Sequence, residues 1–269
     1  MKEIDVYKVL ESKSPKLARR IPRFVISYLR RTIHEKEVNE ILTRFGDLQG
    51  IEFVRAALGY MGVGYHAVGM ERLDKGGRYL FASNHPFGGM DGLMLADEVV
   101  SYFGDVRVVV NDLLMNLEPI KGLFVPVNKH GRQNTANVEA FNDAFESDVP
   151  IITFPAGLCS RRIDGVVKDL EWKPSFVKRA VASRRDIVPV YFDGRLSDFF
   201  YRLHNLRSRF GVKVNIEMLY LVDEMFKQSG RNFEIRIGDP IPYEGLLDGR
   251  TPREAAEYVR ERAYLLGGR

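Results

Sequence analysis

A histidine and an aspartate lie six positions apart around a glycine-rich corner of this chain. In the stretch YLFASNHPFGGMDGLML (residues 79–95), an apolar segment leads to His85, and five residues that include two glycines separate it from Asp91. Because glycine adopts backbone conformations that other residues avoid, the corner can bring the two side chains together. A carboxylate that holds a histidine fixes its tautomer and stabilises the imidazolium, so the pair could act as a general base. The structural alternative is a polar turn residue followed by a helix N-cap.

The elements that must position this pair follow an alternating pattern. Short apolar runs predict strands at residues 78–83, 106–110, 123–127, 149–154, 186–192 and 233–238. The longer segments between and after them predict helices at 91–103, 135–147, 173–185 and 251–266. Such alternation predicts an α/β fold with a largely parallel mixed sheet flanked by helices. Ligands of open α/β sheets bind beyond the carboxyl ends of the strands, which is where His85 follows the first predicted strand.

The first part of the chain has a different pattern. Residues 1–63 are predicted to form a helical N-terminal extension, and residues 64–269 an α/β domain, the two making one compact unit. Apolar residues recur at three- and four-residue steps within residues 21–42, which is typical of an amphipathic helix. Arginines cluster there at positions 19, 20, 23, 30 and 31. This segment is either a basic helix lying on an anionic membrane or an ordinary surface helix with solvated arginines.

Composition narrows the class of protein. Of 269 residues, 45% are hydrophobic and 28% are charged, which is typical of a globular domain with a sizeable core. The net charge of +4 suits an anionic partner such as a lipid headgroup, a phosphorylated cofactor or nucleic acid. No nucleic-acid-binding motif is present, so nucleic acid is not expected. The single cysteine, Cys159, excludes internal disulfides and cysteine-based zinc sites. Without a secretory signal or an apolar run of about 20 residues, we expect a cytoplasmic protein that does not cross the membrane.

Five segments in order resemble the motifs of the glycerophospholipid acyltransferases. They are SNHPFGGMDG (83–92), EPIKGLFVPVNKHGRQN (118–134), ITFPAGLCSRR (152–162), IVPVYF (187–192) and IRIGDPIPY (235–243). The resemblance covers roughly residues 65–245. The spacing of five residues between histidine and aspartate, where the family usually has four, is similar to the bacterial branch that includes proteins labelled haemolysins and the O-acyltransferases of ornithine and glycine lipids.

The resemblance implies a reaction and assigns roles. In that family the histidine removes a proton from the acceptor's hydroxyl, whose oxygen then attacks an acyl thioester of coenzyme A or acyl carrier protein. Carried over, His85 is the base, Asp91 orients it, and Asn84 positions the loop or a substrate. No metal or bound cofactor is implied. The oxyanion also needs donors. The candidates are backbone N–H groups at Gly88, Gly89 or Gly157.

The third motif departs from the family pattern. Ala156 and Cys159 stand where the family has a glutamate and an arginine that help to hold the acceptor's phosphate. The resemblance leaves an acceptor site made of Phe154, Pro155, Gly157, Ser160, Arg161 and Arg162, with Lys129, His130 and Arg132 as a second basic cluster. Either set of basic residues could instead be solvated. The departure makes a lyso-lipid with a carboxylate headgroup at least as plausible an acceptor as glycerol phosphate or lysophosphatidic acid. A nucleophilic Cys159 is not expected because no motif pairs it with a base.

A second basic and apolar stretch bears on the membrane. Large apolar residues alternate with arginines in residues 195–226, which suits an anionic membrane surface. The alternative is that this stretch packs on the core or on another copy of the chain. We predict a lipid O-acyltransferase that binds the inner face of the cytoplasmic membrane peripherally. The rival hypothesis is a non-catalytic, haemolysin-like membrane-binding protein, which would need neither a base nor its partner.

Overall fold

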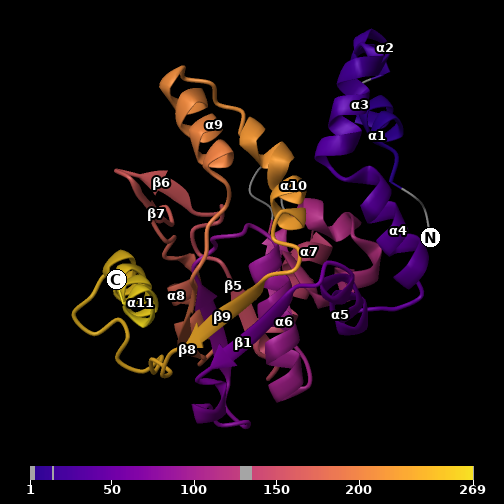
Figure 1. The fold of residues 1–269 in the computed structure, drawn as a ribbon. Coiled ribbons are helices and arrows are strands. Elements are labelled where there is room, and N and C mark those ends of the chain that lie inside the picture. The colour runs from indigo at the N-terminus through magenta and orange to yellow at the C-terminus, as the bar shows by residue number, and fades with distance from the viewer. Residues whose placement is uncertain (1–3, 14, 128–134, 269) are drawn as a thin grey trace.

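A seven-stranded mixed sheet forms the centre of the molecule (Figure 1). The computed structural model describes residues 4–13, 15–127 and 135–268. The strands, in their order across the sheet, are β1 (Gly64–Val68), β9 (Asn232–Ile237), β8 (Asp186–Phe192), β2 (Tyr79–Ser83), β5 (Ile151–Thr153), β3 (Arg107–Asn111) and β4 (Phe124–Val127). Among these strands, only β8 and β9 pair in antiparallel fashion. The predicted α/β fold with a largely parallel mixed sheet is therefore confirmed.

Helices cover both faces of this sheet. Strand β2 is buried at every position, and its side chains alternate between two cores. Phe81 packs with residues of α5 (Ile51–Tyr60) and α6 (Met90–Phe103). Leu80 and Ala82 pack on the other face. The helices of that second face are α7 (Thr135–Glu146), α8 (Ser175–Ala182) and α11 (Pro252–Leu266). Burial on both faces explains why the central strands are mostly apolar.

The C-terminal helix α11 begins with a complete set of helix-start signals. Thr251 precedes Pro252, whose fixed φ suits the first position of a helix. The Thr251 hydroxyl accepts a hydrogen bond from the Glu254 N–H at 3.3 Å, and the Glu254 carboxylate accepts one from the Thr251 N–H at 2.7 Å. This reciprocal capping satisfies donors that the first turn leaves unpaired. It explains why the predicted boundary at residue 251 agrees with the structure to within one residue.

Several elements were not predicted as strands. The edge strand β1 (GYHAV) is partly exposed and less apolar than the central strands. A two-stranded antiparallel hairpin of β6 (Arg161–Ile163) and β7 (Val166–Lys168) follows the third motif. Short 3-10 helices complete the connections: η1 (Met70–Arg72), η2 (Asp112–Asn116) and η3 (Glu118–Leu123). Strands β1, β6 and β7 have three to five residues each, too few for a clear alternation of apolar and polar side chains.

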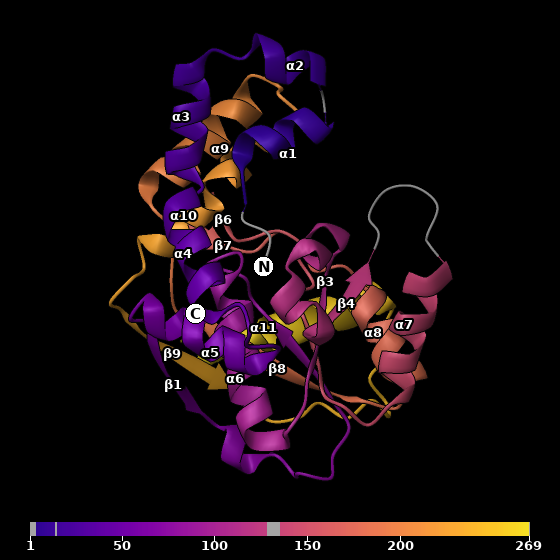
Figure 2. The same ribbon diagram turned by 90° about the vertical axis from the view of Figure 1, so that its right-hand side faces the viewer.

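Two helical segments rise from the same end of the sheet. One contains α1 (Val6–Lys13), α2 (Pro15–Arg20), α3 (Arg23–Thr32) and α4 (Glu35–Phe45), and the other contains α9 (Asp198–Arg209), η4 (Ile216–Tyr220) and α10 (Leu221–Phe226). Both views place α9 and α1–α3 at this end (Figures 1 and 2). The Tyr28 and Tyr220 hydroxyls lie 2.7 Å apart, so α3 contacts η4. The division of the chain at residues 63 and 64 stays a prediction. None of the described helices is both long and apolar enough to span a bilayer.

Candidate active site

His85 and Asp91 meet just beyond the carboxyl end of β2. His85 Nδ1 lies 3.0 Å from Asp91 Oδ2; the Asp91 side chain is fully buried and that of His85 is 15% exposed. The same Asp91 oxygen accepts the Phe87 N–H at 3.0 Å, and its other oxygen accepts the Gly92 N–H at 3.0 Å. Asp91 is the second residue of α6, and the cap position belongs to Gly89, so the N-cap alternative is wrong. The helix N-terminus favours an ionised carboxylate there.

This arrangement fixes the tautomer of the histidine. Because an ionised Asp91 can only accept hydrogen bonds, His85 donates its Nδ1 proton to it. The lone pair of the neutral imidazole then lies on Nε2, which can take a proton from a hydroxyl. The Phe154 ring stacks on His85 with a centroid distance of 4.1 Å and an interplanar angle of 29°. The imidazole is thus held on one edge by a carboxylate and on one face by an aromatic ring.

The glycine corner accommodates the five intervening residues. Gly88 has φ +73°, which a residue with a side chain rarely adopts. A Cβ at Gly88 would lie 2.9 Å from Leu221 Cδ2 and 3.1 Å from Cys159 Cβ, and one at Gly89 would lie 3.3 Å from Met225 Sδ. Helix α10 therefore packs directly on the corner. The space that two missing side chains leave is what allows this close approach.

Asn84 holds the corner to the neighbouring strand. Its amide nitrogen donates to the Phe192 carbonyl at 2.9 Å, and its amide oxygen accepts the Phe192 N–H at 2.7 Å. The side chain is buried, and it extends the pairing of β2 with β8 beyond Ser83, the end of β2, to Phe192, the last residue of β8. Of the two roles predicted for Asn84, this geometry fits positioning of the loop.

A second carboxylate, which sequence reasoning missed, supports the same loop. Asp169 is buried and accepts three hydrogen bonds: from the His85 N–H at 3.2 Å, the Ser160 hydroxyl at 2.6 Å and the Trp172 indole N–H at 2.9 Å. Burial raises the pKa of the Asp169 carboxyl above its ordinary value. Asp169 lies 84 residues from His85 in the sequence. No motif or periodicity marks it, so no sequence signal could have found it.

The third motif supports the histidine rather than standing apart from it. The Ser160 N–H donates to the His85 carbonyl at 2.9 Å, and the Pro155 carbonyl accepts the Lys173 N–H at 3.1 Å. Gly157 has φ +68°, and its N–H donates to the Phe154 carbonyl at 2.9 Å. This turn uses the Gly157 N–H, which weakens its candidacy as an oxyanion donor.

The N–H groups of Gly88 and Gly89 in the corner remain candidate donors for the oxyanion. Within the described part of the chain, the N–H groups of Gly88 and Gly89 make no hydrogen bond to the protein. Both lie between the histidine and the start of α6, where the helix N-terminus also favours negative charge. The arrangement is suited to binding a developing oxyanion.

Arg161 requires a correction to its predicted anion-binding role. Its side chain is almost fully buried, and its Nη1 donates to the Cys159 carbonyl at 2.7 Å and to Cys159 Sγ at 2.8 Å. Nη2 donates to Glu217 at 3.2 Å, and Nε lies 3.2 Å from His204 Nδ1. These partners occupy the donors on all three guanidinium nitrogens. Arg161 therefore anchors η4 and α9 instead of facing an acceptor.

Glu217 is the centre of this buried ion cluster. Arg207 Nε also binds its carboxylate, at 2.9 Å, and His204 Nδ1 lies 3.0 Å from it. Burial alone would raise the pKa of Glu217, but contacts with His204, Arg207 and Arg161 hold that pKa below its ordinary value. Burial lowers the pKa of His204. The cluster fixes the segment that leads into α10, which covers the glycine corner.

The other predicted residues have varied placements. Arg162 is partly exposed, pairs with Asp198 and lies over the Tyr201 ring at 5.1 Å. Cys159 is buried, and burial raises the pKa of its thiol to about 11. Lys129, His130 and Arg132 lie outside the described residues. Among the described residues, no group of three or more His, Cys, Asp or Glu side chains is arranged to hold a metal ion.

Comparisons with known proteins agree with this geometry. A family model described as "Acyltransferase" matches residues 8–268. The lyso-glycine lipid O-acyltransferase of Bacteroides thetaiotaomicron is 45% identical over 98% of this chain and 97% of its own length. That of Phocaeicola vulgatus is 43% identical over 98% of this chain and 95% of its own.

A solved structure shows the fold as well. The chain is similar to the 1-acyl-sn-glycerophosphate acyltransferase PlsC from Thermotoga maritima, with a TM-score of 0.50 and 18% identity. The match covers 81% of this chain and 77% of that one. The resemblance drawn from the five sequence motifs is confirmed: the chain belongs to the acyltransferase family, and it is an acyltransferase.

Proposed function

We propose that this protein transfers a fatty acyl group to the hydroxyl of a lyso-lipid whose headgroup carries a carboxylate, as in lyso-glycine lipid. The observation that carries the proposal is the buried Asp91 carboxylate 3.0 Å from His85 Nδ1 at the carboxyl end of β2. The names of two relatives that match nearly the whole chain support the choice of lyso-glycine lipid. Lyso-lipid acylation places the protein in membrane lipid synthesis.

The reaction uses His85 first as a base and then as an acid. Nε2 removes the proton of the acceptor hydroxyl while the hydroxyl oxygen attacks the carbonyl carbon of the acyl thioester. The N–H groups of Gly88 and Gly89 bind the resulting oxyanion. The intermediate then collapses, the C–S bond breaks, and the imidazolium returns the proton to the departing thiolate. Asp91 stabilises the imidazolium between these two steps.

The donor is an acyl thioester of acyl carrier protein or coenzyme A. Both carriers leave as a thiol, so the proposed steps at His85 are the same for either. The two differ in what must bind outside the reacting atoms: a folded acidic protein or a nucleotide. Measuring kcat/KM with palmitoyl-acyl carrier protein and palmitoyl-coenzyme A distinguishes them.

The third motif supports a carboxylate acceptor over a phosphate. Ala156 and Cys159 provide no charge where the family has a glutamate and an arginine. Arg161, the nearest arginine in sequence, is engaged with Glu217 and the Cys159 carbonyl. These positions therefore lack the free guanidinium that a phosphate dianion would favour.

We also propose that the enzyme binds the inner face of the cytoplasmic membrane through the end of the sheet that carries His85. Helix α9 follows β8, and Asn84 reaches the carboxyl end of β8 at Phe192. Exposed apolar side chains on α3 and over residues 199–219 are Phe24, Tyr28, Phe199, Leu206, Phe210, Val212, Val214, Ile216 and Leu219. Exposed arginines beside them are Arg23, Arg202 and Arg209. Apolar and cationic side chains together suit an anionic bilayer surface.

Flotation with phosphatidylglycerol vesicles tests this orientation. We expect Phe24→Ser and Phe210→Ser to lower the bound fraction, because each side chain is 73% exposed at the proposed contact. Val68→Ser is the control. Because β1 runs antiparallel to β8, Val68 at the carboxyl end of β1 lies at the opposite end of the sheet from His85. Equal flotation of all three variants and the unmodified protein would exclude this face as the contact.

Transfer assays with purified protein test the chemistry. We expect His85→Ala to abolish transfer of a labelled acyl group to lyso-glycine lipid while the protein keeps its thermal unfolding midpoint. In cells that lack the gene, lipid mass spectrometry should show loss of the diacylated glycine lipid and accumulation of its lyso form. Accumulation of lysophosphatidic acid would refute the proposed acceptor. Biological activity that survives His85→Ala would favour the non-catalytic, membrane-binding alternative.

A further inference from the structure

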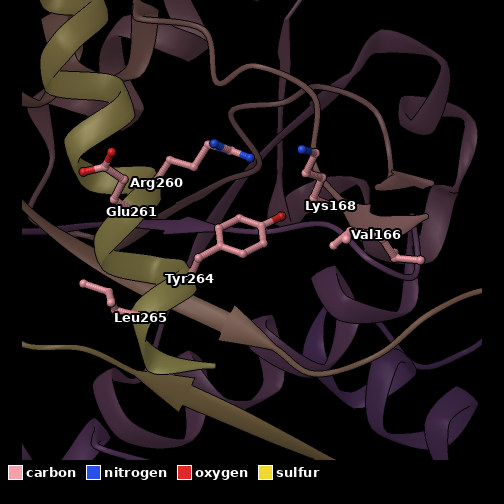
Figure 3. A pocket seen from close by; sticks show the side chains of 7 residues that line it. Val166, Lys168, Arg260, Glu261, Tyr264 and Leu265 are labelled. Atoms are coloured by element: carbon pink, nitrogen blue, oxygen red, sulfur yellow. The ribbon is translucent and has the colours of Figure 1, made fainter. Parts of the chain in front are cut away.

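A groove lies between the β6–β7 hairpin and the C-terminal helix α11, apart from the reacting pair (Figure 3). Its volume is about 410 Å³, within the range of roughly 300–1,000 Å³ that is usual for small-molecule sites. Val166 and Lys168 line it from β7, and Arg260, Tyr264 and Leu265 line it from α11. None of the five acyltransferase motifs includes these residues.

Two cations converge at this groove. The side chains of Lys168 and Arg260 extend toward each other above the Tyr264 ring (Figure 3). Over the described ranges, the Lys168 ammonium has neither an ion pair nor a hydrogen bond. Arg260 Nη1 binds Glu257 at 2.6 Å, but its Nε is buried without a hydrogen-bond partner. The Lys168 ammonium and the outer nitrogens of the Arg260 guanidinium are therefore the donors that the groove offers to an anionic oxygen.

The rest of the groove is apolar. Val166 is 51% exposed and Leu265 is 60% exposed, and both lie beside the two cations. Val167 and the Tyr264 ring continue the apolar lining. Exposed apolar side chains next to paired cations suit a ligand that has an aliphatic chain as well as an anionic head.

The charge balance favours a singly charged head. Glu257 binds Arg260, and Glu261 also lines the groove, although its carboxylate points to the far side of α11 from Lys168 (Figure 3). The Glu257 carboxylate beside Arg260 would repel the second charge of a phosphate monoester more than it would oppose a carboxylate. A carboxylate has two oxygens, one for the ammonium and one for the guanidinium.

From these observations we infer that the groove between β6–β7 and α11 binds the carboxylate of a single-chain amphiphile through Lys168 and Arg260. Two sources share this chemistry: a free fatty acid and an N-acyl amino acid such as the head of a lyso-glycine lipid. The inference rests on the groove itself and does not require the proposed acyl transfer.

The groove has a direct structural link to the histidine loop. The Tyr264 hydroxyl accepts the Asp169 N–H at 2.7 Å, and the Asp169 carboxylate accepts the His85 N–H at 3.2 Å. A ligand seated on Tyr264 would therefore contact the residue that supports Asp169. Binding at the groove and the geometry of the catalytic loop share this support.

Isothermal titration with N-dodecanoylglycine, below its micelle concentration, tests the inference. This ligand has the carboxylate but no 3-hydroxyl, so it cannot be acylated and binding is measured without turnover. Replacing both cations (Lys168→Met with Arg260→Met) should weaken binding by about tenfold or more, because charge-assisted hydrogen bonds are lost. The control pair, Lys178→Met with Arg262→Met, removes the same charge from α8 and α11 outside the groove and should bind as the unmodified protein does.

The ligand series identifies the head and its source. The methyl ester of N-dodecanoylglycine should bind at least about tenfold more weakly than the acid, because it has no charge. Dodecanoate that binds as tightly as N-dodecanoylglycine would support the site with fatty acid as its source, and weaker dodecanoate binding would support it with an N-acyl amino acid.

Three results would overturn the inference: equal affinity of the Lys168/Arg260 variant and the control pair, equal binding of ester and acid, or tighter binding of dodecyl phosphate. The His85→Ala variant keeps the groove intact. If it bound N-dodecanoylglycine normally and also retained transfer activity, the proposed function would fail while the groove assignment stood. Thermal unfolding of each variant identifies any that does not fold, and the single Lys168→Met variant, whose side chain lies at the groove edge, then replaces the pair.

Discussion

Asp91→Asn keeps the shape of the side chain but removes its charge and one acceptor, which makes it a sharp test of the reacting pair. Three donors point at the Asp91 carboxylate: His85 Nδ1 and the Phe87 N–H at one oxygen, and the Gly92 N–H at the other. An asparagine has one oxygen and one NH2 group, so it cannot accept from all three. The consequence depends on which way the amide is turned.

If the amide oxygen faces His85, it accepts from Nδ1 and Phe87, and the NH2 group meets the Gly92 N–H. If the NH2 group faces His85, it donates to Nδ1, forces the proton onto Nε2 and opposes the Phe87 N–H. Each orientation leaves one buried donor unpaired, so we expect a loss of about 1–3 kcal/mol in the free energy of unfolding. The second orientation also protonates the nitrogen that should act as base.

The rate should fall much further than the stability. Neither orientation supplies a negative charge to the imidazolium, and general base catalysis is usually worth about 10²- to 10⁴-fold. We therefore expect kcat for acyl transfer to lyso-glycine lipid to fall by about that factor. The assay is transfer of a radiolabelled acyl group, followed by thin-layer chromatography, with unfolding followed by circular dichroism.

Asp97→Asn is the matched control on the same helix. Asp97 accepts hydrogen bonds from Arg55 Nε at 2.6 Å and from the Tyr65 hydroxyl at 2.8 Å, so its replacement also breaks a partly buried network. It should lower stability while leaving kcat within about threefold of the unmodified enzyme, since it contacts no part of the histidine loop. If Asp91→Asn kept kcat within the same threefold, or if both variants lost activity equally, Asp91 would not be the partner of the base.

Three further changes test the loop, the ion cluster and the thiol. Gly88→Ala should lose most transfer activity and about 2–5 kcal/mol of stability, because φ is +73° and the new Cβ would lie 2.9 Å from Leu221; Gly104→Ala, with φ +88° and open space, should lose only about 1–2 kcal/mol by thermal unfolding. Glu217→Ala should lose about 3–5 kcal/mol in urea unfolding because it leaves buried arginines without a counter-charge, whereas Glu234→Ala at an exposed pair should lose about 0–1 kcal/mol; equal losses would contradict the cluster's role. Burial raises the pKa of the Cys159 thiol to about 11, so the thiolate is a minor form below that pH. Iodoacetamide at pH 8 should therefore label Cys159 only in unfolded protein, which mass spectrometry can check. Rapid labelling of the folded protein would refute the burial of Cys159.

Much of the fold could be predicted because its signals are local. Strand β8 is apolar at every position after Asp186 because it is buried on both faces, and that pattern is visible in a few residues. The edge strand β1 has no such pattern, since only its pairing with β9, more than 160 residues away, makes it a strand. Residues 195–226 divide between core and surface: Phe200 and Tyr201 are buried in the core, while Phe199 and Leu206 are exposed. Binding of the exposed side chains to a membrane stays a prediction.

The same distinction applies to the site. His85 and Asp91 are close in sequence, so their spacing alone predicted a contact that the structure places at 3.0 Å. Asp169 reaches the histidine loop through His85, 84 residues away, and Glu217 binds Arg161, 56 residues away, so no local sequence pattern identifies either carboxylate. Arg161 shows the consequence for the prediction. Its position in the third motif suggested a residue that binds an anion, and only the fold shows that Glu217, 56 residues further on, already pairs with it.

The two departures from the family motifs lie against each other in the structure. The corner between His85 and Asp91 is one residue longer than usual, and Gly88 within it faces Cys159, where the family has an arginine. A Cβ at Gly88 would lie 3.1 Å from Cys159 Cβ, so the corner packs closely against position 159. Cys159 is buried at this contact, and its small side chain leaves room for the close approach. The nearest guanidinium in sequence is that of Arg161, which binds Glu217. This contact holds the segment that leads into α10, the helix that covers the corner. The absence of charge at positions 156 and 159 leaves the contact between His85 and Asp91 intact.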